Sequence, residues 1–229
     1  FNQGEVCSAG SRIIIEESIK DAFVKRLAQR ANAMTIGNPL DNPDMGPLVT
    51  EGHMNRVLSY IQKGIDEGAT LVCGGERYTE GECASGYYVR PTIFDDCTSD
   101  MTIVKEEIFG PVLPVLTFRT IGGAIAAVRR QPRPLALYLF TENKKHEQAV
   151  LKHCHFGGGC VNDTVLHLVS HTLPFGGTGE SGMGACHGKY SFDTFSRDKS
   201  ILKKPSHPDV FVRYPQWWPA AERILRQKM

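Results

Sequence analysis

The sequence has no apolar run that approaches the roughly 20 residues needed to cross a bilayer, and no signal-peptide pattern opens it. An excess of one charge is also missing, since 26 Lys and Arg residues balance 25 Asp and Glu residues to a formal net charge of +1. A protein that binds nucleic acid or another polyanion through bulk charge needs a strong basic excess. We therefore expect neither a membrane anchor in this chain nor a nucleic-acid partner.

Several familiar catalytic and metal-binding motifs are absent as well. The eight histidines show no HExxH spacing, and no serine stands in a GxSxG sequence. There is no Walker A lysine, and no GxGxxG sequence lies between a predicted strand and a predicted helix. The seven cysteines are scattered and form no CxxC pair, which argues against a zinc site or a disulfide scaffold. We expect no metal site, and the cysteine pattern favours a reducing, cytoplasmic setting.

What the sequence does contain is a regular alternation of predicted strands and helices. With 229 residues, of which 41% are hydrophobic, the chain can bury a sizeable core. The predicted strands cover residues 11–15, 70–73, 92–94, 112–118, 135–140 and 159–162, and the predicted helices cover 19–36, 50–67, 121–130 and 144–153. This order favours an α/β fold with a largely parallel sheet.

Local signals predict some boundaries and faces. Ser18 and Asp21 have the spacing of a capping box at the start of the first helix. In the second helix, one face carries apolar residues, which predicts that this face is buried: Val57, Leu58, Ile61 and Ile65. Residues 174–188 carry six glycines, which predicts irregular backbone that another part of the molecule approaches closely.

Cys7 is the first residue that could carry chemistry. It lies in a polar loop that contains Gly4 and precedes a strand. A thiol in such a loop can be exposed, and nearby donors can lower its pKa and make it a nucleophile. A buried, unreactive thiol is the commoner state of cysteine, so the loop alone leaves both interpretations open.

The acidic pair Glu106 and Glu107, followed by Phe109 and a Gly-Pro turn, is the second candidate. A carboxylate can accept hydrogen bonds from both hydroxyls of a ribose, and an aromatic ring can stack on a planar heterocycle. A solvated acidic pair before a turn is the more common arrangement. The spacing alone therefore leaves open both a cofactor site and a plain surface loop.

Taken together, four segments resemble the aldehyde dehydrogenase superfamily. FNQGEVCSAGSR resembles the active-site cysteine signature of that family, and VKEEIFGPVLPV resembles its cofactor-ribose segment. GGGCVND and LPFGGTGESGMG resemble its late core segments, and IGNPLD and GPLVT lie between the first two. The resemblance covers essentially the whole chain and is to the C-terminal half, the catalytic-cysteine portion, of a full-length relative.

Two branches of the family contribute to this resemblance. Up to about residue 118 the chain resembles betaine aldehyde dehydrogenase-like members, as in GHMNRVLSYI and CTSDMTIVKEEIFGPV. From about residue 133 onward, PRPLALYLF and SGMGACHGKYSFDTFS resemble the class-three and fatty aldehyde dehydrogenase branch. The chain resembles a hybrid or divergent member, which weakens any inference about its aldehyde.

The resemblance implies a fold and an activity. It implies an aldehyde dehydrogenase-like catalytic domain over residues 1–153, and C-terminal segments over 154–229 that complete the active site and the oligomerisation surface. It implies oxidation of a small-molecule aldehyde to a carboxylic acid with NAD or NADP, by a homo-oligomer. The general-base glutamate, the second oxyanion donor and the glycine-rich cofactor loop of the family lie in the half that this sequence does not include.

The resemblance also implies roles for single residues. Cys7 would be the nucleophile, and its backbone N–H would be one oxyanion donor. Glu107 would hold the nicotinamide ribose, with Glu106 as the neighbouring alternative. Phe109 would contact or position the nicotinamide end.

Weaker implications concern five further positions. His53 and Arg56 lie where the family's second helix approaches the cofactor. Asn162 and Phe175 belong to late segments that act as structural supports or pocket walls. Glu5 stands where many relatives have glutamine, and a carboxylate that faces the thiol would disfavour the thiolate.

Two alternatives to an NAD(P)-dependent enzyme stay open. One is a non-catalytic orphan fragment or pseudoenzyme that associates with full-length subunits. The other is a cofactor-independent thiol esterase that uses Cys7 alone. The isolated chain is also expected to fold poorly, because apolar strands with open edges lack sheet partners.

Overall fold

A computed structural model of the chain describes residues 1–208, 215 and 218–227. The chain forms two compact units, Phe1–Phe195 and Ser196–Met229, which are described separately below. All candidate site residues named from the sequence lie in the first unit.

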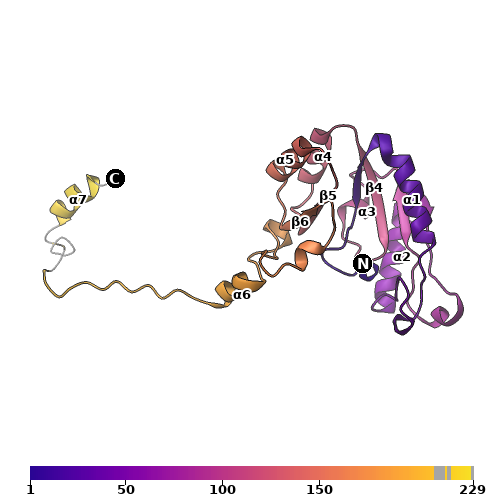
Figure 1. The fold of residues 1–229 in the computed structure, drawn as a ribbon, viewed down its shortest axis with the longest axis horizontal. Helices are drawn as coiled ribbons and strands as arrows, with labels where there is room; N and C mark the ends of the chain where they lie inside the picture. Colours follow the sequence, from indigo (N-terminus) through magenta and orange to yellow (C-terminus); the bar gives the residue numbers. More distant parts are fainter. Residues whose placement is uncertain (209–214, 216–217, 228–229) are drawn as a thin grey trace. The chain divides into compact units, whose positions relative to one another are not determined.

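A four-stranded sheet with the order β1-β4-β3-β2 forms the centre of the first unit (Figure 1). Its strands are β1 (Ile13–Glu16), β2 (Thr70–Cys73), β3 (Thr92–Asp95) and β4 (Val112–Phe118). β4 pairs in parallel with both β1 and β3, and β2 runs antiparallel at the β3 edge. The predicted α/β fold with a largely parallel sheet is confirmed, with one antiparallel edge strand.

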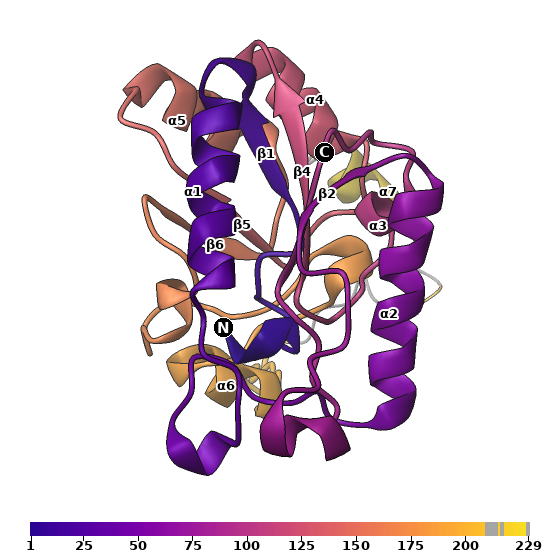
Figure 2. The same ribbon diagram turned by 90° about the vertical axis from the view of Figure 1, so that its right-hand side faces the viewer.

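Helices cover both faces of this sheet (Figure 2). They are α1 (Lys20–Asn32) on one face, and α2 (Glu51–Asp66) and α3 (Thr102–Lys105) on the other. Ile93 and Val115 pack with Val24 of α1, whereas Phe94 and Leu116 pack on the α2 side. Successive strand residues point to opposite faces, so both faces of β3 and β4 are buried.

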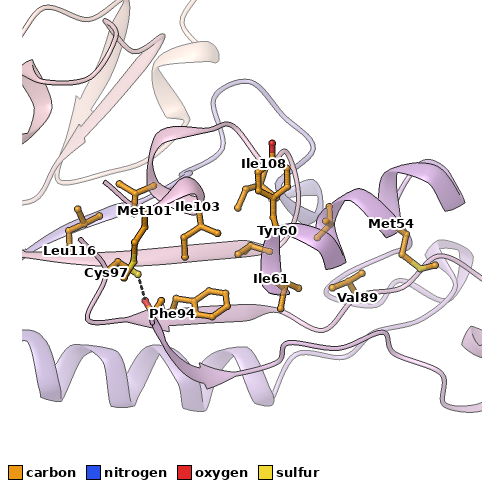
Figure 3. Close-up of a cluster of buried hydrophobic side chains, with 14 of the residues drawn as sticks. Met54, Tyr60, Ile61, Val89, Phe94, Cys97, Met101, Ile103, Ile108 and Leu116 are labelled. Atoms are coloured by element: carbon orange, nitrogen blue, oxygen red, sulfur yellow. Dashed lines mark hydrogen bonds between the residues drawn. The ribbon is translucent and has the colours of Figure 1, made fainter. Parts of the chain in front are cut away.

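The main hydrophobic core lies between α2, α3 and the sheet (Figure 3). Val57 and Phe94 are fully buried, and Ile103 and Ile108 belong to the same cluster. Burying one such side chain stabilises the fold by about 1.5–3 kcal/mol relative to leaving it in water. The Cys97 thiol donates to the Phe94 carbonyl at 3.7 Å inside this core. The core holds α2 and the loop after α3, and both of these elements reach the candidate site.

A second, smaller sheet pairs β5 (Ala136–Leu139) with β6 (Gly158–Val161) in parallel. α5 (Lys144–His153) connects the two strands, and α4 (Ile121–Arg129) lies beside α5 (Figure 1). None of the residues in β5 and β6 is fully buried. A two-stranded sheet is only marginally stable by itself. The exposed surface of β5 and β6 could therefore be covered by additional polypeptide.

Several element boundaries agree with the sequence patterns. The predicted strands at 70–73 and 112–118 and the predicted helix at 144–153 have the bounds of β2, β4 and α5. Thr50 caps α2, because its hydroxyl oxygen accepts from the His53 N–H at 3.2 Å.

Two local predictions are wrong. Ser18 does not cap α1, because a 3-10 turn over Glu17–Ile19 precedes the helix and the Ser18 hydroxyl donates to Glu16 at 3.1 Å. Ile65 is 41% exposed. The buried stripe of α2 instead consists of Met54, Val57, Tyr60, Ile61 and Gly64. The pattern of large apolar residues had left out a tyrosine and a glycine, which also pack inward.

The second unit, Ser196–Met229, contains one α-helix within its described residues, α7 (Trp218–Arg226). The predicted boundary between residues 153 and 154 falls inside the first unit, where β6 pairs with β5 across it. The division of roles between 1–153 and 154–229 stays a prediction. In the ranges that the structure describes, no helix combines the length and the apolar character that a bilayer span requires.

Candidate functional site

Cys7 lies in an exposed turn, the cysteine turn (residues 6–9). The Ala9 N–H donates to the Val6 carbonyl at 2.9 Å and closes this turn around Cys7 and Ser8. Ser8 is buried, with 1% of its surface exposed. Among the described residues, no acceptor bonds the Cys7 N–H, so this amide is free to bind an oxygen atom. One residue therefore presents both an exposed thiol and an unoccupied donor.

Gly4 packs the cysteine loop (residues 1–10) onto the acidic loop (residues 106–110). Its φ is +80°, a region that residues with a Cβ rarely adopt, and an added Cβ would collide with the Gly110 carbonyl oxygen. Gly110 packs in turn on α2, since a Cβ there would lie 2.6 Å from Val57 Cγ2. The two motifs that resemble the cysteine and cofactor signatures are therefore in direct backbone contact.

The Glu5 carboxylate joins the cysteine loop to the start of α2. Its two oxygens accept from the Val49 N–H and from Gln3 Nε2, each at 3.1 Å. His53 Nε2 lies 3.5 Å from the Glu5 Oε1 atom and 2.7 Å from the Phe109 carbonyl oxygen. Because a carbonyl only accepts, His53 carries a proton on Nε2 in this arrangement. Val49 and His53 thus hold one carboxylate oxygen at the start of α2, and Gln3 of the cysteine loop holds the other. None of these contacts involves residues 6–9 of the cysteine turn.

The two glutamates of the acidic loop have different surroundings. Glu106 accepts from the Tyr60 hydroxyl at 2.6 Å, which holds it against α2. Glu107 is exposed, and within the described part of the chain its carboxylate has neither a hydrogen bond nor an ion pair. Arg56 Nη2 lies 3.5 Å from the Glu107 carbonyl oxygen. Burial lowers the pKa of Arg12, and the nearby charge of Glu107 opposes that shift. Glu107 thus has the open carboxylate of the pair.

Phe109 adopts a left-handed backbone conformation with φ +60°, which is uncommon for an aromatic residue. Such a conformation persists where the surroundings hold it, and here His53 bonds the Phe109 carbonyl while Gly4 and Val57 pack on Gly110. The ring is 37% exposed. The structure therefore brings the acidic loop, the cysteine loop and the start of α2 together.

The late segments reach the cysteine turn through Tyr138. Its hydroxyl donates to the Ser8 carbonyl at 2.7 Å. Its ring meets the edge of His167 with 5.8 Å between centroids, and His167 lies 6.3 Å from the Phe175 ring. Phe175 stacks on His187 at 5.6 Å. A row of four rings thus runs from the cysteine turn into the glycine-rich segment.

Asn162 holds the end of β6. Its side-chain oxygen accepts from the Thr141 N–H at 2.8 Å, and its side-chain nitrogen donates to the Thr141 carbonyl at 3.0 Å. Its backbone N–H donates to Leu139 at 2.7 Å. All three bonds hold the backbone at the end of β5 and just after it, so Asn162 stabilises the local backbone conformation.

Sequence reasoning missed Tyr138 and His167. Tyr138 stands in an otherwise apolar run, and a tyrosine in such a run needs a partner for its hydroxyl. That need was the available signal, although it does not identify Ser8 as the partner. His167 is 8% exposed and had no motif around it.

The model of the aldehyde dehydrogenase family matches residues 1–201. The chain belongs to the aldehyde dehydrogenase family. The 4,4'-diaponeurosporen-aldehyde dehydrogenase of Staphylococcus aureus is 39% identical over 94% of this chain. Aldehyde dehydrogenase family 3 member H1 of Arabidopsis thaliana is 37% identical over 98% of it. A solved point mutant of betaine aldehyde dehydrogenase from Staphylococcus aureus, in complex with NAD+ and with a BME-modified cysteine, is 34% identical over 93% of this chain, with a TM-score of 0.86.

These likenesses confirm the predicted aldehyde dehydrogenase-like fold, and they include a betaine aldehyde dehydrogenase and a family 3 member. The chain spans about half the length of the curated relatives it matches, 45% in both cases, and 43% of the solved chain. The activity of a complete aldehyde dehydrogenase is therefore not assigned to this chain on similarity alone.

Proposed function

We propose that this chain supplies the nucleophile and part of the cofactor site for oxidation of an aldehyde to a carboxylic acid with NAD or NADP. One observation carries the proposal: the loop with the exposed Cys7 packs through Gly4 directly on the loop with the open Glu107 carboxylate. A reaction between a thiol-bound substrate and a cofactor requires such closeness. The general base and the remaining cofactor contacts would come from the length of the relatives that this chain does not span, which makes it the C-terminal, cysteine-bearing half.

Glu107 and Phe109 fit a nicotinamide cofactor. The Glu107 carboxylate, which has neither a hydrogen bond nor an ion pair among the described residues, can accept from both hydroxyls of a ribose. The partly exposed Phe109 ring can contact a planar heterocycle. Glu106 fits less well, because the Tyr60 hydroxyl already bonds it. The similar betaine aldehyde dehydrogenase is described in complex with NAD+, which supports assigning Glu107 to the ribose and Phe109 to the nicotinamide end.

The chemistry assigned to this chain begins at Cys7. Its thiolate adds to the aldehyde carbon, a C–S bond forms, and the carbonyl π electrons move to the oxygen. The free Cys7 N–H donates to that oxyanion, and one such donor is worth about 100- to 1,000-fold in rate. When bound, the cofactor supplies the oxidation by accepting a hydride from the thiohemiacetal carbon. Water then cleaves the Cys7 thioester, which releases the carboxylic acid and restores the thiol.

The proposal includes a homo-oligomer, a small-molecule aldehyde and a cytoplasmic setting. β5 and β6 leave all their residues at least partly exposed, which suits a sheet that further chain completes. All seven cysteines are free thiols, as a reducing compartment would keep them.

The test expresses the chain within the complete reading frame of its gene and follows NAD(P)H formation with a panel of aldehydes. Cys7→Ser should abolish turnover, whereas Cys186→Ser, at another exposed thiol, should leave it unchanged. Glu107→Gln should raise the KM for the cofactor about 10- to 100-fold, the range expected for losing hydrogen bonds to a charged group. Glu106→Gln should mainly lower the melting temperature, because it weakens the bond with Tyr60. Turnover that survives Cys7→Ser would refute the proposal.

A non-catalytic role in association with full-length subunits is the second candidate. Its support is the β5–β6 sheet, whose residues all stay at least partly exposed and could be covered by another subunit. It predicts a reading frame without a glycine-rich cofactor loop and general-base glutamate, and a chain that co-elutes with a full-length relative. Ester cleavage that needs no cofactor and is lost in Cys7→Ala would instead support a thiol esterase.

A further inference from the structure

We infer that Tyr138 is a positioning residue for Cys7, because its hydroxyl fixes the carbonyl of the residue that follows the nucleophile and thereby orients the thiol and the amide N–H of the turn. This inference rests on the proposed role of Cys7. The contact that carries it joins Tyr138 Oη to the Ser8 carbonyl oxygen at 2.7 Å, across 130 residues of sequence.

This bond is the one hydrogen bond that ties residues 6–10 to the rest of the described chain. The other side-chain bonds that hold the cysteine loop from outside end earlier, at Gln3 and Glu5. Inside the turn, a single amide-to-carbonyl bond remains. Removing the Tyr138 hydroxyl would therefore leave residues 6–10 without a hydrogen bond to the rest of the described chain.

The surroundings keep the phenol in its donating form. Burial raises the pKa of Tyr138 above its usual value, and an amide hydrogen bond from Val165 opposes part of that rise. The phenol therefore keeps its proton at neutral pH, and its partner at Ser8 is a carbonyl that can only accept. A negative charge on the sulfur of Cys160 or Cys7 would raise the pKa of Tyr138 further.

The strand register and His167 hold the tyrosine ring in place. Tyr138 stands opposite Cys160 in the β5–β6 pair, and the Cys160 sulfur lies 3.6 Å from His167 Nδ1. His167 packs its ring at 60° to that of Tyr138. A Cβ at Gly158 would lie 3.1 Å from His167 Cδ2, so the glycine leaves the room that this ring occupies. A ring held by its strand register and by a packed neighbour presents its hydroxyl in a fixed direction, which is the property of a preorganised support.

The first experiment compares Tyr138→Phe with Tyr78→Phe in the full-length protein. Both changes remove one phenol hydroxyl, and the Tyr78 hydroxyl bonds Glu80 at 3.3 Å in an exposed loop. A misplaced reacting group lowers the rate without weakening binding, so Tyr138→Phe should lower kcat about 10- to 100-fold and leave both KM values within about twofold. Tyr78→Phe should change neither. An unchanged kcat in Tyr138→Phe, or a fall in kcat that follows a fall in melting temperature, would overturn the inference.

A second measurement reads Cys7 itself. Trypsin cleaves after Arg12 and separates Cys7 from the six other cysteines of the sequence, so mass spectrometry of the peptide that ends at Arg12 follows the labelling of Cys7. Alkylation by iodoacetamide requires the thiolate only, whereas acylation by an activated ester also requires stabilisation of an oxyanion. Tyr138→Phe should slow acylation about tenfold relative to alkylation, as expected when an oxyanion donor is misaligned. An unchanged ratio would overturn the inference and leave Cys7 as the nucleophile.

The two proposals can fail separately. If Cys7→Ser leaves aldehyde oxidation intact, the proposed function fails, and hydrogen exchange at the Ala9 amide then tests the positioning. Faster exchange in Tyr138→Phe at an unchanged melting temperature would support a turn held by the hydroxyl. Exchange as slow as in the unchanged protein would overturn it.

Discussion

Gly4→Ala directly perturbs the contact between the cysteine loop and the acidic loop. The new Cβ would collide with the Gly110 carbonyl, and Gly110 cannot retreat because Val57 lies behind it. The left-handed backbone at Gly4 costs a residue with a Cβ about 1–2 kcal/mol. Forcing two packed segments apart costs about 1–3 kcal/mol more. We therefore expect Gly4→Ala to lower the free energy of unfolding by about 2–5 kcal/mol.

Gly10→Ala is the matched control in the same loop, because nothing lies within 4 Å of the position of its Cβ. It should change the free energy of unfolding by less than about 1 kcal/mol. Urea unfolding followed by circular dichroism measures both variants, and for a chain of this size each kcal/mol corresponds to roughly 2–4 °C in melting temperature. Equal stability of the two variants would refute the packing of Gly4 on Gly110.

The remaining predictions concern pH and the packing of α2. Burial lowers the pKa of His167 in the folded protein, so the unfolded chain binds a proton at this side chain more readily than the folded chain. The contribution of His167 to the free energy of unfolding is fully present above its usual pKa of 6.5 and is lost as the pH falls toward its lower pKa in the folded state. The melting temperature should therefore decrease on acidification below that value, and a slope that persists in His167→Gln would assign the effect to other groups. The Cβ added by Gly52→Ala would have no atom within 4 Å, so this substitution should stabilise α2 by about 0.5–1 kcal/mol. Gly64→Ala would bring a Cβ to 3.0 Å from Ile103 and 3.1 Å from Phe94, so overpacking of about 1–3 kcal/mol should outweigh the helical gain, and a raised melting temperature would show that the core yields.

Sequence patterns predicted the elements whose formation depends on local chemistry and two-sided burial. β4 (Val112–Phe118) reads as a continuous apolar run because helices cover both of its faces. The predicted second helix begins at Thr50, the residue that caps α2 in the structure, and such a cap acts within one turn. Ser18 misled because the same residue type also bonds its own neighbours, here Glu16, outside a helix.

The site was predictable only to the level of candidates. Spacing could not separate Glu106 from Glu107, since the distinguishing partner, Tyr60, lies 46 residues from Glu106. The contact between Gly4 and Gly110 likewise joins distant segments and leaves no periodic signal. The resemblance to a family made Cys7 the candidate nucleophile, whereas the hydroxyl that bonds its turn became visible only in three dimensions.

The hydrogen bonds that hold the cysteine loop can form only at certain stages of the chain's synthesis. The Gln3 side chain donates to the Pro47 carbonyl, 44 residues later in the chain, whereas the Ser8 carbonyl accepts from the Tyr138 hydroxyl, 130 residues later. A ribosome adds about 5–20 residues per second, so roughly 7–26 s separate the synthesis of the turn from that of its anchor. During that interval the nascent chain carries Cys7 as an ordinary thiol. A translation product that stops before β5 would therefore contain Cys7 without the hydroxyl that bonds its turn.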